Sequence, residues 1–356
     1  SPVSCPGVMA SKESFGNLIP DPLSKKLQQD GVPFSELRQA SLSPEILIEE
    51  IYRLWRSTNL RVERNWNGIL DQPNNIPYSN SSCLLPDDRL YLETSSLRHL
   101  WKLATWNVNS IRTRLPLLLQ WLKENNPDVV CLQETKVEDT LFPVWELQQA
   151  GYESAFSGQK SYNGVAILSK HPIRNVKTGF RNGYDAENAR LISATVSGIR
   201  LFNVYVPQGQ TTESEKFQYK LKYFTELIQE FKAENNSDNA LVIMGDFNIA
   251  PKAEDLSNPE SMRNKVSFHP EEHALLAELV DCGLSDLFRK FDQRSGQFSW
   301  WDFRTRGFER DEGMRIDYIL ANSVLTSSCQ ACIIDTEARE QDRPSDHAPV
   351  IAEFKL

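Results

Sequence analysis

Polar side chains occur at the ends of apolar, β-rich runs along the second part of the chain. A loop at the end of a strand presents such groups to solvent. Oxygen donors with a single imidazole favour a hard cation such as Mg²⁺, because zinc would call for more His or Cys. This combination predicts a site for a hard divalent cation. The residues are Asn107, Asn109, Glu134, Tyr205, Asp246, Asn248, Asp317, Asp346 and His347.

Each of these residues also has an ordinary structural interpretation when taken alone. A strand-end Asp is usually a turn former or a cap, and a lone Asn in a turn is usually structural. Asp346 and His347, followed by Ala348 and Pro349, fit an ordinary loop equally well. The chemical interpretation therefore depends on the whole set occurring along one chain.

The elements that must position this set begin at Trp101. Helical periodicity occurs at 115–124, 213–234 and 271–279. Alternating strands and helices with a few direct strand-to-strand steps predict two packed sheets with outer helices. Strands are expected in the runs KLATWNV, DVVCLQET, GVAILSK, RLISATV, RLFNVYV, ALVIMGDFN, RIDYILAN and APVIAEF.

Residues 1–100 read differently and are interpreted as an N-terminal extension, with a catalytic domain at 101–356. The extension is rich in Ser, Asn, Pro and Leu, and one helix is predicted at 42–57. Its apolar positions recur at helical spacing after a Ser-Pro start. We expect this helix to pack on the main domain or on a partner, with a DNA-contacting arm as the alternative.

Composition limits the remaining classes. No apolar run approaches the roughly 18 residues of a membrane span, and the first residues do not read as a secretory signal. Six cysteines do not form a disulfide framework, and the pair Cys329 and Cys332 lacks a second pair for zinc. We expect an intracellular monomer, cytoplasmic or, in a eukaryote, nuclear or organellar. The net charge of −9 suggests a short DNA footprint.

The ordered motifs resemble the exonuclease III-like apurinic/apyrimidinic (AP) endonucleases of the endonuclease/exonuclease/phosphatase superfamily, from about Leu103 to Phe354. PQG after Tyr205, SWWDFR at 299–304 and MRIDYIL at 314–320 favour this repair branch. The resemblance implies a four-layered α/β sandwich of two packed mixed sheets flanked by helices. It also implies Mg²⁺-dependent cleavage 5′ to abasic sites in double-stranded DNA, with Mn²⁺ able to substitute. Exonuclease and trimming activity at recessed 3′ ends would accompany it.

The resemblance also implies roles for single residues. Glu134 resembles the principal magnesium ligand, with Asn109 as a further candidate, and Asp246 resembles the group that positions or deprotonates the attacking water. Asp317 would fix the ring of His347, which contacts a phosphate oxygen. Tyr205 would act as a donor or stabilise the nucleophile. The implied metal set is Asn107, Glu134, Asp246, Asn248, Asp346 and His347, with Asn107 and Asn248 also orienting the water and holding the phosphate.

Substrate contacts are implied for four more residues. Trp300 and Trp301 would line a pocket for an extruded, base-free sugar. Arg190 and Arg315 are candidate phosphate contacts. Two other classes stay open: another superfamily phosphoesterase acting on phosphoinositide or lipid phosphates, and an inactive DNA-binding relative. One-metal and two-metal schemes both fit the ligand set.

We predict that a truncation starting near Ser96 keeps near-normal turnover on abasic DNA, because every motif residue lies beyond Trp101. Loss of the extension's apolar helix face is expected to lower the melting temperature instead. Gel assays of the soluble truncation measure turnover. A loss above about a hundredfold, roughly 2.7 kcal/mol of barrier, would place the extension in the active site.

Overall fold

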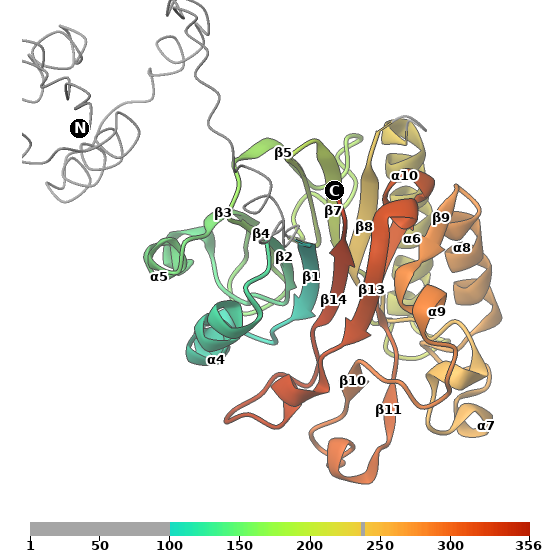
Figure 1. The fold of residues 1–356 in the computed structure, drawn as a ribbon. Coiled ribbons are helices and arrows are strands. Elements are labelled where there is room, and N and C mark those ends of the chain that lie inside the picture. The colour runs from blue at the N-terminus through green and yellow to red at the C-terminus, as the bar shows by residue number, and fades with distance from the viewer. Residues whose placement is uncertain (1–99, 236–238) are drawn as a thin grey trace, which may run out of the picture. The chain divides into compact units, whose positions relative to one another are not determined.

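The computed structural model describes residues 100–235 and 239–356, which form two six-stranded sheets packed face to face (Figure 1). The helix predicted at 42–57 lies outside these residues, as does the N-terminal extension up to residue 99. The first sheet has the order β13-β14-β1-β2-β4-β3. Its strands are β1 (Trp101–Asn107), β2 (Val129–Gln133), β3 (Glu153–Ser157), β4 (Val165–Ser169), β13 (Cys329–Ile334) and β14 (Val350–Phe354).

The second sheet has the order β5-β6-β7-β8-β12-β9. Both sheets are mixed, because β1 pairs in parallel with β2, and β7 with β8, while the other pairs are antiparallel. The strands are β5 (Ile173–Thr178), β6 (Leu191–Val196), β7 (Ile199–Tyr205), β8 (Leu241–Asp246), β9 (Leu284–Asp286) and β12 (Asp317–Asn322). A two-stranded ribbon joins β10 (Trp300–Trp301) and β11 (Gly313–Met314).

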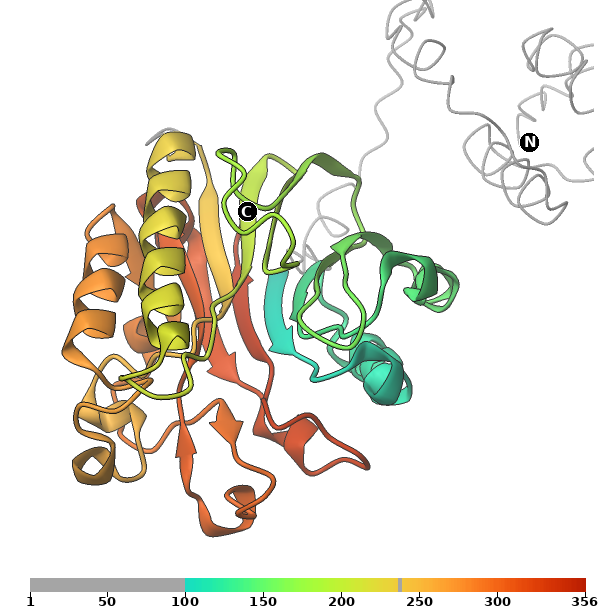
Figure 2. The ribbon, with the colours of Figure 1, turned by 180° about the vertical axis from the view of Figure 1, so that it is seen from behind.

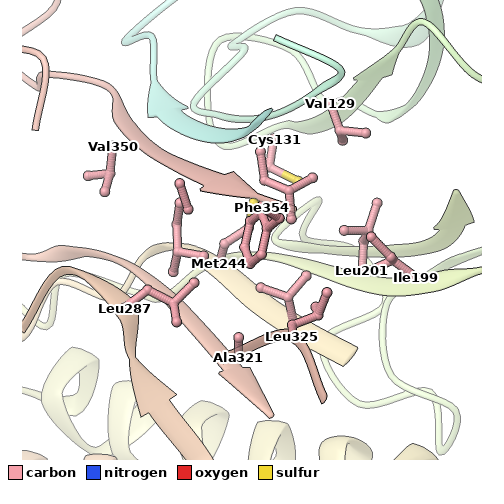
Figure 3. Packing of buried hydrophobic residues seen from close by; sticks show 14 of the residues in the cluster. Val129, Cys131, Ile199, Leu201, Met244, Leu287, Ala321, Leu325, Val350 and Phe354 are labelled. Atoms are coloured by element: carbon pink, nitrogen blue, oxygen red, sulfur yellow. The ribbon is translucent and has the colours of Figure 1, made fainter. Parts of the chain in front are cut away.

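Strand periodicity explains why the sheets pack in layers. Successive side chains of a strand point to opposite faces, so a strand that is apolar throughout is buried on both. In β2, Val129 and Cys131 face the second sheet, whereas Val130 and Leu132 face the helices outside. The central core lies between the sheets, where β2 and β14 residues meet Leu201 and Met244 of the second sheet (Figure 3).

Helices cover both outer faces and complete the predicted four-layered sandwich (Figures 1 and 2). The first sheet is covered by α4 (Ile111–Asn125) and α5 (Val144–Gln149), and the second by α6 (Glu215–Glu234) and α8 (Pro270–Val280). No helix among the described residues is both long and apolar enough to cross a membrane. The shorter helices are α7 (Pro259–Met262), α9 (Leu287–Phe291) and α10 (Ser323–Ser328).

The three helices predicted in the catalytic domain are present as α4, α6 and α8. Helix α4 begins four residues earlier than its apolar pattern, because Ser110 and Ile111 donate backbone hydrogen bonds to Glu134 and Thr135. Cys329 and Cys332 are free and buried in β13.

Gly245, the residue before Asp246, shows how tightly β7 and β8 are joined. It has φ +145°, and an added Cβ would lie 2.0 Å from the carbonyl oxygen of Val204 on β7. We predict that Gly245→Ala lowers the free energy of unfolding by at least about 3 kcal/mol, because the clash adds to the backbone strain.

Gly283→Ala is the matched control, because Gly283 has φ +95° but nothing within 4 Å of an added Cβ. It should lose only about 1–2 kcal/mol from conformational strain. Urea unfolding of both variants measures the difference. Equal losses would contradict the steric argument.

Candidate active site

The polar residues of the predicted set, from Asn107 to His347, meet at one end of the two sheets. Parallel strands end at the same edge of a sheet, so β1 and β2 place Asn107 and Glu134 together, and β7 and β8 place Tyr205 and Asp246 together. Strand β12 starts at this end, with Asp317 directly opposite Asp246. The loop before β14 brings Asp346 and His347 to the same place.

The side chain of Asn107 links the two sheets at this end. Its Nδ2 donates to Glu134 Oε1 at 2.8 Å and to Asp246 Oδ2 at 2.9 Å. Its Oδ1 accepts from the backbone N–H of Asn109 at 3.0 Å. The carboxamide nitrogen therefore faces the carboxylates. In this arrangement Asn107 acts as a donor that links the two carboxylates.

Several site residues adopt left-handed backbone conformations, which residues other than glycine rarely take. The φ angles are +51° at Glu134, +43° at Asn109 and +52° at Asn248. Backbone hydrogen bonds from Ser110 to Glu134 O at 2.7 Å and from Asn248 N to the Asp246 carboxylate at 2.9 Å hold these turns. Such strain concentrates at functional sites, where it aims particular side chains.

His347 lies between two carboxylates. Its Nδ1 is 2.9 Å from Asp317 Oδ2, and its Nε2 is 3.8 Å from Asp246 Oδ2. Burial alone would lower the pKa of His347, but the charges of Asp317 and Asp246 outweigh it and raise the pKa to about 10. The ring is therefore an imidazolium at neutral pH, and each of its nitrogens carries a proton that it can donate.

Asp246 and Tyr205 hold their protons more strongly than usual. Burial raises the pKa of Asp246 to about 7, against the lowering effect of His347. Burial and the charges of Glu134 and Asp246 raise the pKa of the Tyr205 phenol well above its ordinary value. Tyr205 is thus a hydrogen-bond donor at physiological pH, and Asp246 can accept a proton from water near neutrality.

Asp346 is fixed at the rim of the site. Its Oδ1 accepts from Asn109 Nδ2 at 2.9 Å, and its Oδ2 accepts from Trp300 Nε1 at 3.1 Å. Burial would raise the pKa of Asp346, but His347 and these two hydrogen bonds bring it below its ordinary value. These two hydrogen bonds fix the carboxylate relative to Asn109 and Trp300 and leave a lone pair on each oxygen.

The ligand atoms of Glu134, Asp246 and His347 lie within 4.8 Å of one another. Two carboxylate oxygens from different sheets converge here, and the ammonium of Lys136 already lies 2.7 Å from Glu134 Oε2. The donor set fits a hard cation held by Glu134 and Asp246. The imidazolium of His347 fits a phosphate oxygen better than a metal, because it has no lone pair to offer while protonated.

Of the other residues predicted to contact substrate, Trp300 and Arg190 lie at the site, whereas Trp301 lies in the core. Trp300 is half-buried at the site, and its indole nitrogen bonds Asp346. Trp301 is only 2% exposed and packs edge-on against Phe298 and Phe308, so it belongs to the core beneath the loop. Arg190 stacks on the ring of Tyr205, 4.6 Å from its centre.

Arg315 is not placed to bind phosphate, which corrects the sequence-based prediction. Its side chain is 1% exposed. The guanidinium is paired with Asp255 at 2.7 Å and with Asp286 at 2.8 Å. A neighbouring arginine, Arg289, also pairs with Asp255. Arg315 therefore neutralises buried carboxylates and ties the loop before β12 to β9.

Two residues of the site escaped the sequence analysis. Ser299 is fully buried, and its Oγ donates to Asp317 Oδ2 at 2.7 Å and accepts from the backbone N–H of Asp317 at 3.1 Å. Lys136 donates to Asn109 Oδ1 at 2.5 Å besides pairing with Glu134. Ser299 begins the SWWDFR run and Lys136 stands two residues after Glu134, but neither residue type signals a role by itself.

Known proteins resemble this chain over its described part. The profile of the endonuclease/exonuclease/phosphatase family matches residues 104–347. Exodeoxyribonuclease III of Haemophilus influenzae is 36% identical over 266 residues, which are 71% of this chain and all of that protein. An AP endonuclease structure from Archaeoglobus fulgidus has 38% identity and a TM-score of 0.70, and the match covers 72% of this chain and 100% of that one.

A 3′ phosphatase from Neisseria, solved with a product DNA hairpin, has 39% identity and a TM-score of 0.70. The match covers 71% of this chain and 99% of that one. The chain thus belongs to the endonuclease/exonuclease/phosphatase family. This family membership agrees with the resemblance seen in the motifs.

We predict that Asp317→Asn lowers the pKa of His347 by about one unit or more, because the charge of Asp317 helps to raise it. NMR titration of the imidazole nitrogens measures the pKa. Asp292→Asn is the control, since it removes a carboxylate that pairs with an exposed arginine. An unchanged titration of His347 in Asp317→Asn would contradict the assigned pair.

Proposed function

We propose that this protein is a DNA-repair phosphodiesterase that cleaves the backbone 5′ to an abasic site and leaves a 3′ hydroxyl. The observation that carries the proposal is the donor Asn107 holding Glu134 and Asp246 together beside the Asp317–His347 pair. Relatives named as exodeoxyribonuclease III and AP endonuclease support the same chemistry. Trimming of recessed 3′ ends is expected from the same site.

The roles follow from charge and position. Asp246, whose pKa is raised to about 7, accepts a proton from the attacking water or orients it. His347 as an imidazolium and Tyr205 as a neutral phenol donate to phosphate oxygens as negative charge develops. Asn248 has its Nδ2 bonded to Val206 O at 2.9 Å, which leaves its Oδ1 toward water or a cation.

Magnesium is the proposed cofactor, with manganese as a substitute. Glu134 and Asp246 would hold it, with Asn248 as a further oxygen donor. When bound, the ion would neutralise charge on the phosphate and on the leaving oxygen. Hard carboxylate and carboxamide oxygens favour this cation over zinc.

We propose that the abasic site is recognised by two aromatic side chains, Trp300 and Tyr162, which are called the aromatic rim. Trp300 is held in place by Asp346, so its exposed part can serve as an apolar wall for a sugar without a base. Tyr162 is 70% exposed and lies on the loop whose Asn163 accepts a backbone hydrogen bond from Lys136. An exposed aromatic so close to the site suits contact with the DNA around the lesion. We propose that the protein acts inside the cell as a monomer.

The test is incision of a duplex with one abasic site in millimolar Mg²⁺, resolved on a denaturing gel. We expect a product with a 3′ hydroxyl, and Glu134→Ala should lower the rate by at least about a hundredfold, with partial recovery in excess Mg²⁺. An intact abasic duplex after incubation with the wild-type protein would rule the function out.

Two controls make this result specific. Glu138→Ala changes an exposed carboxylate four residues from Glu134 and should leave the rate unaltered. An undamaged duplex of the same sequence should show no cut at internal positions, because it offers no base-free sugar for the aromatic rim. Cleavage of phosphoinositides instead of DNA would support the other branch of the superfamily.

A further inference from the structure

A buried ion pair lies next to the site, where helix α6 packs on helix α8. Lys220 of α6 is 1% exposed and pairs with Glu272 of α8, which is fully buried. The other lysines of α6 are exposed to solvent. Removing two opposite charges from water is costly, and apolar side chains of similar volume often stabilise a core as well. A pair in this position therefore suggests a role beyond joining the two helices.

The ammonium of Lys220 uses its donors inside the protein. Its Nζ donates to the backbone oxygen of Asn248 at 2.7 Å and to that of Gln208 at 3.2 Å, besides pairing with Glu272. An ammonium has three N–H groups, so these three acceptors account for them. Asn248 follows β8 and Gln208 follows β7, so one cation ties together the loops that leave two neighbouring strands.

Asn248 is the residue through which this cation meets the site. Its φ of +52° is unfavourable for a residue with a Cβ, so neighbouring groups must hold it there. Its backbone N–H donates to Asp246 Oδ1 at 2.9 Å, and its Nδ2 donates to the backbone oxygen of Val206 at 2.9 Å. Lys220 binds the remaining polar group of its main chain, the carbonyl oxygen. These three contacts fix how the carboxamide of Asn248 is turned.

Glu272 holds the chain on the other side of this turn. Its Oε1 accepts from the backbone N–H of Ser267 at 3.1 Å, and its Oε2 accepts from that of His269 at 3.0 Å. The backbone oxygen of Ser267 in turn accepts from the N–H of Ala250, two residues beyond the turn, at 2.8 Å. Lys220 thus binds the turn itself, and its partner holds the loop to which the following residues are bonded.

We propose that Lys220 is a positioning residue for phosphodiester hydrolysis, because its ammonium holds the turn that aims the carboxamide oxygen of Asn248 at the catalytic centre. The inference rests on the proposed function, in which Asn248 offers that oxygen to water or to a cation. Lys220 is buried and its donors are occupied, so it acts through Asn248 and does not touch DNA. Its loss should therefore slow the chemical step and leave DNA binding unaltered.

The test compares the rate of the chemical step with DNA binding in two variants. Lys220→Met keeps the length of the side chain and removes the ammonium, whereas Lys220→Arg keeps a positive charge and N–H donors. We expect Lys220→Met to lower the single-turnover rate of abasic-duplex incision, at saturating enzyme, about thirtyfold. The Kd for the same duplex in EDTA should change less than about twofold, and Lys220→Arg should recover the rate to within about fivefold of the wild type.

Two further variants separate positioning from stability. Lys220→Met leaves the carboxylate of Glu272 buried without its partner, so the double variant with Glu272→Gln removes both charges and serves where the single variant does not fold. Arg289→Met is the matched control, because it removes a cation from another buried pair, formed with Asp255. Its melting temperature should fall, while its incision rate should stay within about twofold of the wild type.

The side-chain amide signal of Asn248 in ¹⁵N NMR spectra reports the turn without any need for activity. It should move in Lys220→Met and in the double variant, and keep its wild-type position in Arg289→Met. A wild-type rate in either folded Lys220→Met protein, or an equal loss of rate in Arg289→Met, would overturn the proposal. A failure of the proposed function would show instead as no incision by the wild-type protein, while the Asn248 signal would still respond to Lys220.

Discussion

The site depends on keeping two like charges close together. Glu134 directly follows β2 of one sheet and Asp246 is the last residue of β8 in the other, and both accept a hydrogen bond from the carboxamide of Asn107. Two carboxylates this close and this buried repel each other, and the raised pKa of Asp246 reflects its poor solvation. Packing of the two sheets therefore holds these two carboxylates together. A bound cation, or a proton on one of them, reduces their repulsion.

A second polar link supports that spacing deeper in the core. Gln133 precedes Glu134, and its Nε2 donates to Asn203 Oδ1 at 2.7 Å. Asn203 in turn donates to the backbone oxygens of Leu132 at 2.9 Å and Ala166 at 2.8 Å. Hydrogen bonds between the sheets are directional, whereas the apolar contacts around them are not. They set the register in which the two halves of the site meet.

Much of this arrangement was predictable because the polar residues of the site stand at the ends of apolar runs that form strands. The apolar runs, their order and the polar residues after them predicted both the sandwich and the set from Asn107 to His347. The prediction for Arg315 was wrong because the sequence around an arginine looks the same whether its side chain faces solvent or a buried carboxylate such as Asp255. The burial of Trp301 could not be predicted either, since a strand of two residues shows no periodic pattern, and Ser299 lies just before that strand.

The pairing of β1 with β14 has a consequence for biosynthesis. The first strand of the catalytic domain lies between β2 and β14, and Thr105 pairs with Val350 across some 245 residues of chain. Contacts of such long sequence separation form slowly. A nascent chain on the ribosome keeps this edge of β1 unpaired until the last strand emerges. A chain cut short before Asp346 lacks this partner of β1 and also lacks two residues of the predicted site, Asp346 and His347.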